Sequence, residues 1–223
     1  WIHDYREDSG EGGSHKLFPI RRIHTKHNLD DFFINQDYTQ IAGTSREGKG
    51  QIIDLDLGRA VSALELPGMP HLSSGISWQY QGTTVLATPN IKTSTVTIVD
   101  TKNWKVIKEI PTKGPGFFMR SHENSRYAWV DVFFGENHDL MHVIDKQTLE
   151  IVKTLRPAPG KTSAHVEFTK DGRYALVSIW DMDGALVIYD AETLQEVKRL
   201  PMKKPSGKYN VHNKLTRSAG TSH

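Results

Sequence analysis

The sequence of 223 residues contains no cysteine, which excludes disulfide bonds, thiolate zinc sites, a cysteine nucleophile and haem attached through Cys-x-x-Cys-His. It has no run approaching the roughly 18 consecutive apolar residues of a membrane helix, and no charged-then-apolar targeting signal. Net charge is also small, since 28 Lys and Arg residues stand against 26 Asp and Glu residues and leave a formal charge of +2. The basic residues are scattered, so we expect no nucleic-acid partner. Because the long apolar run is missing, we also expect no membrane span.

Several catalytic motifs are missing as well. There is no Gly-rich phosphate loop, no Gly-x-Ser-x-Gly nucleophile elbow and no His-Glu-x-x-His helix, so common nucleotide and hydrolase chemistries have no support. The chain starts at Trp1 rather than Met, and we expect it to be a processed chain or a piece of a longer one.

The sequence does contain an internal repeat. Three segments align without gaps and a fourth matches more loosely: residues 96–110, 141–155, 186–200 and, loosely, 50–66. The aspartates that mark the repeats, Asp54, Asp100, Asp145 and Asp190, are spaced by 46, 45 and 45 residues. Such a period is typical of a β-propeller blade.

Each repeat has the pattern of four short strands. An apolar run ends at the marker aspartate, a second run follows, and a Pro- or Gly-rich crossing leads to two further runs separated by a turn such as residues 170–172. The alternative is an amphipathic helix over residues 191–200, where Leu194, Val197 and Leu200 are three apart. The adjacent apolar pairs in the matching repeats favour a strand.

We therefore predict an all-β fold of four-stranded antiparallel propeller blades, four to five in number. Residues 1–30 are predicted to form a partial blade and a flexible loop, and residues 31–223 the remaining blades. Because most closed propellers have more blades, we expect that this chain alone does not close a ring. Missing N-terminal blades or a second copy would complete it.

One position recurs at the start of the first strand of each blade. His71 and Phe117 lie 17 residues after their marker aspartates, His165 lies 20 after and Tyr209 lies 19 after. If these side chains converge on one face, they suit a flat aromatic cofactor, with His ligating its iron, Phe stacking on it and the phenol transferring a proton. The alternative is that each His is a structural residue. His122 falls where other repeats have surface turns, and we expect it to be exposed.

Longer motifs carry a family resemblance. They are Met69-Pro70-His71 with Gly75, GFFMRSH at residues 116–122, YAWVD at 127–131, SIWD at 178–181, residues 190–194, and PSGKYNV at 205–211. Across residues 50–213 the chain resembles the C-terminal half of the cytochrome d1 domain family. The resemblance implies an eight-bladed propeller that binds haem d1, and a periplasmic location.

Departures within these motifs indicate which branch of the family is nearest. The nitrite reductases have two distal histidines, of which one matches His71, whereas the other falls within residues 32–38, near Asn35, where no His occurs. Their Arg three residues after the first His is Ser74 here. His165 and Tyr209 instead resemble the pair that lies beside the substrate propionate in the dihydro-haem d1 dehydrogenase branch. The resemblance thus implies an enzyme that desaturates a propionate of dihydro-haem d1 to acrylate, the last step of haem d1 biosynthesis.

The same resemblance implies roles for individual residues. His71 would ligate the haem iron, and Tyr209, close to His165, would take a proton from the propionate arm. Phe117, Phe118 and Trp180 would pack on the ring, and Ser206 and Gly207 would let the backbone approach its edge. Arg120, Lys161 and Lys208 are either partners for haem carboxylates or solvated surface charges.

Partners and alternatives follow from the same comparison. The cofactor would be haem d1 or dihydro-haem d1, with haem c only in an N-terminal domain that this chain lacks, and a cytochrome would accept the electrons. The alternatives are a cytochrome cd1-type nitrite reductase, a non-catalytic haem d1 carrier or scaffold, and an interaction propeller without a cofactor.

Overall fold

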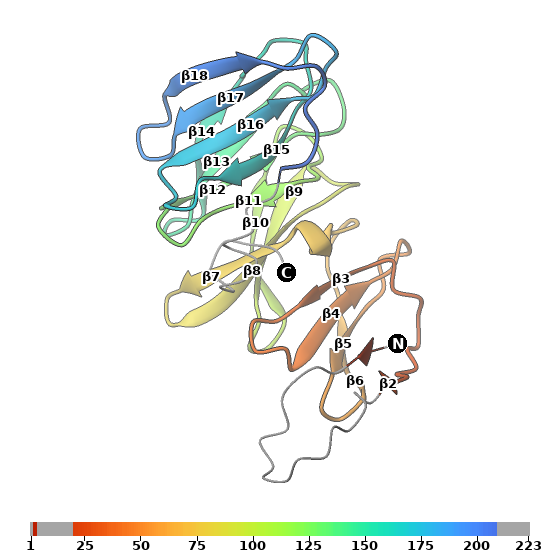
Figure 1. Ribbon diagram of the computed structural model, residues 1–223. Helices are drawn as coiled ribbons and strands as arrows, with labels where there is room; N and C mark the ends of the chain where they lie inside the picture. Colours follow the sequence, from red (N-terminus) through yellow and green to blue (C-terminus); the bar gives the residue numbers. More distant parts are fainter. Residues whose placement is uncertain (1, 4–19, 209–223) are drawn as a thin grey trace, which may run out of the picture.

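The structure is a computed structural model that describes residues 2–3 and 20–208 (Figure 1). Within them, strands form four four-stranded antiparallel sheets and one two-stranded ribbon of β1 (Ile2–His3) and β2 (Ile20–Arg21). The described residues contain a single short 3-10 helix, η1 (Leu72–Ser74). The all-β prediction is therefore confirmed.

Each sheet is a meander whose strands pair in chain order. The first sheet contains β3 (Asp31–Ile34), β4 (Gln40–Thr44), β5 (Gly50–Asp54) and β6 (Arg59–Leu64). The second contains β7 (Ile76–Tyr80), β8 (Thr83–Pro89), β9 (Thr95–Asp100) and β10 (Lys105–Pro111). The third contains β11 (Met119–Arg120), β12 (Tyr127–Asp131), β13 (Met141–Asp145) and β14 (Glu150–Leu155). The fourth contains β15 (Ser163–Phe168), β16 (Tyr174–Ile179), β17 (Ala185–Asp190) and β18 (Glu196–Pro201). This is the arrangement of propeller blades.

The marker aspartates build the same turn in every sheet. The Oδ1 atom of Asp145 accepts hydrogen bonds from the backbone N–H groups of Gln147 and Thr148, at 2.7 and 3.2 Å. Four residues after each aspartate the backbone turns left-handed, at Gly58, Trp104, Leu149 and Leu194, with φ between 55° and 67°. The N–H of that residue donates to the carbonyl of the aspartate. Each of these hairpins also contains a bulge three residues beyond the left-handed residue, where the fourth strand has one extra residue: Val61, Ile107, Val152 or Val197.

The blades are held together by apolar layers between consecutive sheets. Trp129, Met141 and Val143 of the third sheet pack against Val177 and Val187 of the fourth. Equivalent clusters join the second sheet to the third and the first to the second. Each sheet therefore buries apolar side chains against the next sheet along the chain. This packing fixes the relative positions of the first strand of each sheet, namely β3, β7, β11 and β15.

Residues 196–201 form the strand β18, which confirms the strand prediction over the helix alternative. The expectation for His122 is wrong, because this residue is fully buried rather than exposed. Its Nε2 atom lies 3.1 Å from the Lys170 carbonyl, in a turn of the next blade, and Gly172 in that turn has no side chain to displace the imidazole. His122 is thus a contact between blades.

The described residues include no helix with the length and apolar character that crossing a membrane would need.

Candidate functional site

The starts of the first strands bring aromatic rings from three blades together. His71 precedes β7, Phe117 and Phe118 precede β11, and His165 lies within β15. Their ring centroids are separated by 3.9 Å (His71 to Phe117), 4.6 Å (Phe117 to Phe118) and 3.8 Å (Phe118 to His165). We call these four residues the aromatic row. Tyr209, the fourth residue at the recurring position, lies outside the described residues.

Three more rings lie beside the aromatic row. Phe133 lies 5.4 Å from Phe117 and 5.5 Å from Trp180, and Phe134 lies 5.8 Å from Phe117. The Trp180 ring meets His165 edge-on at 5.9 Å. Trp180 was expected near the site, whereas Phe133 and Phe134 were missed. The signal for them is a second Phe-Phe pair two residues after a buried strand end, which mirrors Phe117 and Phe118.

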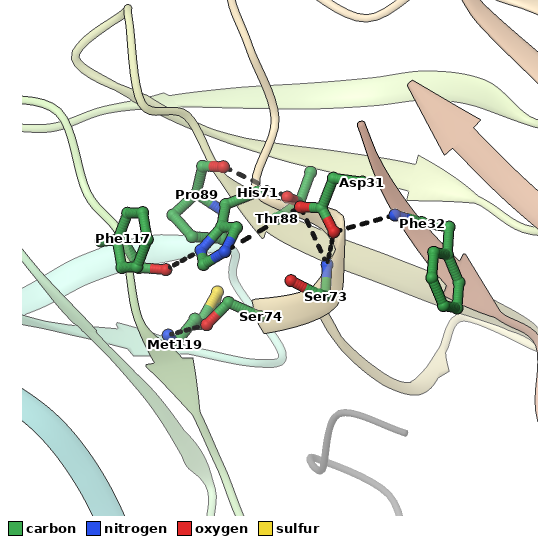
Figure 2. A network of polar contacts seen from close by, with 9 residues as sticks. All are labelled: Asp31, Phe32, His71, Ser73, Ser74, Thr88, Pro89, Phe117 and Met119. Carbon is green, nitrogen blue, oxygen red and sulfur yellow. Dashed lines mark hydrogen bonds and ion pairs between the residues drawn. The ribbon is translucent and has the colours of Figure 1, made fainter. Parts of the chain in front are cut away.

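His71 has one nitrogen engaged by a backbone carbonyl. Its Nδ1 atom lies 2.5 Å from the carbonyl oxygen of Phe117, as Figure 2 shows. A carbonyl can only accept, so Nδ1 carries the proton and Nε2 of the neutral ring has the lone pair. The side chain is 15% exposed. His71 can therefore act as a metal ligand through Nε2, with its ring oriented by the carbonyl.

Asp31 lies on the other side of this imidazole. Its Oδ2 atom is 3.9 Å from Nε2 of His71, and its carboxylate also accepts the N–H groups of Phe32 and Ser73 (Figure 2). Asp31 is the first residue of β3, so it holds in the first sheet the place that the aromatic row holds in the others. Asp31 was not predicted from the sequence, because no marker aspartate precedes it from which to count.

Ser74, at the position of the reductases' arginine, is buried and structural. Its hydroxyl oxygen accepts the N–H of Met119 at 3.3 Å and so joins η1 to β11 (Figure 2). This position of the site therefore offers a short hydroxyl rather than a cation.

His165 stands in an unusual backbone conformation. Its φ is +53°, in a bulge between Ala164 and Glu167 that interrupts the pairing of β15 with β16. Burial is the main cause that lowers the pKa of His165 to about 4, and the positive charges of Lys208 and Arg120 contribute to the same shift. The imidazole is therefore neutral at pH 7, and one of its nitrogens can accept a hydrogen bond.

Two cations lie beside His165. Arg120 pairs with Glu167 at 3.6 Å, and both side chains are largely buried. The Lys208 ammonium donates hydrogen bonds to the His165 carbonyl and, at 2.5 Å, to the Ser178 hydroxyl. Burial lowers the pKa of Lys208 to about 8, while Glu167 acts in the opposite direction. Because Glu167 offsets one of the two positive charges, Arg120, Lys208 and Glu167 together leave one net positive charge beside His165, which suits a carboxylate.

The remaining predicted residues are Lys161, Ser206 and Gly207. Lys161, whose side chain is 32% exposed, pairs with the exposed Asp183 at 2.5 Å. Ser206 and Gly207 are exposed residues that follow β18. A separate cavity of about 670 Å³ is lined by residues 124–127, 171–173 and 190–192, which are mainly charged or polar and include one aromatic residue, Tyr127.

The nitrogen and oxygen donors of this site suit a metal whose other ligands come from a bound macrocycle rather than from the protein. The described part of the chain has no group of three or more His, Cys, Asp or Glu side chains that could hold a free ion. One imidazole nitrogen with flat aromatic walls instead suits a tetrapyrrole iron, since the macrocycle supplies the other nitrogens.

Comparisons with known proteins agree with this geometry. The family described as "Cytochrome D1 heme domain" matches residues 21–214. The chain is 57% identical over 204 residues to the dihydro-heme d1 dehydrogenase of Pseudomonas aeruginosa, covering 91% of this chain and 41% of that protein. It is 31% identical over 157 residues to Protein NirF of the same organism, covering 70% of this chain and 38% of that one. The chain thus spans about two fifths of the length of these relatives.

Solved structures show the same likeness. The dihydro-heme d1 dehydrogenase NirN in complex with DHE superposes with a TM-score of 0.84 at 58% identity, covering 87% of this chain and 42% of that one. The hydrazine synthase of Kuenenia stuttgartiensis superposes with a TM-score of 0.63 at 16% identity, over 83% of this chain and 53% of that one. The second likeness concerns the fold alone.

Proposed function

Because this chain belongs to the cytochrome D1 heme domain family, we propose that it is the haem d1-binding part of an oxidoreductase that desaturates a propionate of dihydro-haem d1 to acrylate. The observation that carries the proposal is the aromatic row, in which one imidazole presents a free lone pair and a second, neutral imidazole lies beside buried cations. The complete protein, of which this chain spans a part, would perform the last step of haem d1 biosynthesis.

His71 is proposed to bind the substrate iron through Nε2. The Phe117 carbonyl holds the Nδ1 proton, which keeps the lone pair on Nε2 and strengthens it as a ligand. Phe117, Phe118 and Trp180 supply apolar faces against which the macrocycle packs, with Ser206 and Gly207 at its edge.

Arg120 and Lys208 are proposed to receive carboxylates of the tetrapyrrole. Both lie close enough to His165 to lower its pKa, so a carboxylate that they bind lies close to His165 as well. Charge-assisted hydrogen bonds in a partly buried site fix orientation as well as affinity.

Tyr209 and His165 are proposed as the catalytic pair. Loss of two hydrogens from the propionate arm releases two protons and two electrons, and the electrons pass to an acceptor cytochrome. Tyr209 would take one proton from the arm as its own phenolic proton passes to His165, whose imidazole is neutral at pH 7 and can accept it. The second proton would leave to solvent. The acceptor haem, the remaining blades of an eight-bladed ring and a periplasmic location are parts of the same proposal.

The test uses the full-length protein and purified dihydro-haem d1, with an electron acceptor and without oxygen. Absorption spectra follow binding and conversion separately. We expect Tyr209→Phe and His165→Gln to bind the tetrapyrrole with conversion slowed by about 100-fold or more, and His71→Ala to lose the spectrum of the ligated iron. His138→Ala is the matched control, because His138 bonds Thr162 at 2.9 Å and makes no ring contact with the aromatic row.

Each outcome separates the candidate functions. Unchanged turnover by Tyr209→Phe would remove Tyr209 as the base. Wild-type protein that binds dihydro-haem d1 and releases it unaltered would be a carrier, and one that turns over nitrite with an electron donor would be a reductase.

A further inference from the structure

A single buried carboxylate holds the middle of the aromatic row. Asp131 ends β12, and its side chain is fully buried. Its Oδ1 atom accepts the N–H groups of Phe117 and Phe118, at 2.8 and 3.0 Å. Its own N–H donates to the Phe118 carbonyl at 3.2 Å. Asp131 thus holds this two-residue segment from both its side chain and its backbone.

The Phe117–Phe118 segment held by Asp131 determines which nitrogen of His71 carries the proton and how its ring is covered. The Phe117 carbonyl that receives the Nδ1 proton belongs to the residue whose N–H donates to Asp131. The Phe117 ring also covers the imidazole at 3.9 Å, with 30° between the planes. Displacement of this backbone would move both the acceptor and the stacked ring.

The same segment reaches the second histidine. The Phe118 ring covers His165 at 3.8 Å, again with 30° between the planes. Gly116, just before the segment, leaves no room for a side chain, because a Cβ atom would come within 2.8 Å of the Asp131 carbonyl. The segment is therefore fixed against β12 on two sides.

The Asp131 carboxylate makes these contacts while its second oxygen is buried unfavourably. Its Oδ2 atom has no hydrogen-bond partner among the described residues, although it is buried. An unpartnered buried polar atom lowers the stability of the folded state, so an acid here is destabilising while its other oxygen orders the segment.

We propose that Asp131 is a positioning residue of the site, which fixes the Phe117–Phe118 backbone and thereby the Nδ1–H tautomer of His71 and the placement of His165. The inference rests on the proposed function only for what the two histidines do. The tautomer itself can be measured without any tetrapyrrole.

The experiment compares Asp131→Asn with Asp131→Ala in the full-length protein. Long-range ¹H–¹⁵N spectra of ¹⁵N-histidine-labelled protein, free of tetrapyrrole, report which nitrogen of His71 carries the proton. The asparagine oxygen can still accept both N–H groups, so this variant is expected to keep the wild-type tautomer. The alanine variant is expected to show both tautomers and to bind haem d1 about 10- to 100-fold more weakly.

A matched control comes from a second buried acid. Asp139 also has an oxygen without a partner among the described residues, and it bonds the N–H of Gly160 rather than residues 117–118. Asp139→Ala is expected to leave the His71 tautomer unchanged. Should Asp131→Ala not fold, Asp131→Ser takes its place, since its shorter side chain keeps a polar atom but cannot reach both N–H groups.

Two results would overturn the inference. One is a wild-type His71 tautomer in the folded alanine or serine variant. The other is an asparagine variant as altered as the alanine one, because the acceptor geometry would then not be what matters. If the tautomer shifts as expected but no variant or wild type binds haem d1, the positioning role stands and the proposed function fails.

Discussion

The Phe118 ring covers the imidazole of His165 in the same geometry in which Phe117 covers His71, with centroid distances of 3.8 and 3.9 Å and 30° between the planes in both pairs. Adjacent residues of one segment thus each shield one predicted site histidine from water. Such shielding contributes to the burial that lowers the pKa of His165 to about 4, because a charged imidazole loses hydration there.

Truncation of Phe118 is expected to raise the pKa of His165. In Phe118→Ala, water reaches the imidazole, and its pKa should move from about 4 toward the ordinary 6.5. Titration of the His165 ring proton by NMR measures this. Phe134→Ala is the control, since Phe134 contacts Phe117 and Phe133 and is already 36% exposed. An unchanged His165 pKa in Phe118→Ala would show that the ring does not shield it.

Removal of the Lys208 charge should also raise the pKa of His165, but through lost electrostatic repulsion rather than through hydration. The ammonium disfavours protonation of His165, so Lys208→Met is expected to raise the His165 pKa. The variant also loses hydrogen bonds to the His165 carbonyl and Ser178, at a cost of about 1–2 kcal/mol in unfolding free energy. Lys161→Met, which removes a surface ion pair with Asp183, should change neither quantity measurably. Equal His165 titration curves for the wild type and Lys208→Met would contradict the electrostatic cause.

The fold was predictable because its determinants are local and repeated. Each marker aspartate bonds N–H groups two or three residues ahead, so a period of about 45 residues in the sequence becomes a period of hairpins in space. The position of His122 was not predictable in this way. Its burial depends on a turn of the next blade, 48 residues away in the chain, and on the glycine within that turn.

The site was predictable where it repeats and where the family resemblance indicated residues, as it did for Phe118 and Trp180. Counting from marker aspartates indicated His71, Phe117 and His165, and the structure places these side chains in one row. Asp31 and Asp131 were missed, because each is an ordinary aspartate in sequence and acquires its role from a contact with another blade or another segment. The sequence marks Asp131 only as the last residue of the YAWVD motif at residues 127–131, an acid after an apolar run, and neither feature indicates that it holds residues 117–118.

The pH dependence of stability should report the burial of Asp131. Burial raises the pKa of Asp131 to about 7 from an ordinary 3.8, so the folded protein binds a proton that the unfolded chain has lost between these values. Its contribution to stability is therefore present below pH 3.8 and lost as pH rises through 7. Asp131→Asn cannot ionise, and its unfolding free energy should rise relative to the wild type between pH 4 and 7, by up to about 4 kcal/mol.

Urea unfolding of both proteins at several pH values measures this difference. His142 and His165, whose pKa values burial lowers to about 4, destabilise the folded state as pH falls below 6.5. They titrate alike in both proteins, so their effect cancels in the comparison. A wild-type-minus-variant difference that is flat with pH would mean that Asp131 is ionised throughout this range.

Gly172 offers a test of the contact between the third and fourth blades. Its φ is +75°, and a Cβ atom would lie 2.5 Å from Nδ1 of His122. Gly160 has the same φ of +75°, but a Cβ atom there would meet nothing within 4 Å. Gly160→Ala therefore costs only the backbone strain, about 1 kcal/mol, whereas Gly172→Ala also displaces a buried imidazole and should cost about 2–4 kcal/mol. Adding His122→Ala to Gly172→Ala should recover part of the difference, because it removes the clashing ring. Urea unfolding of the wild type, Gly172→Ala, His122→Ala and the double variant measures the coupling. Equal costs for the two glycine substitutions would mean that His122 does not pack under this turn.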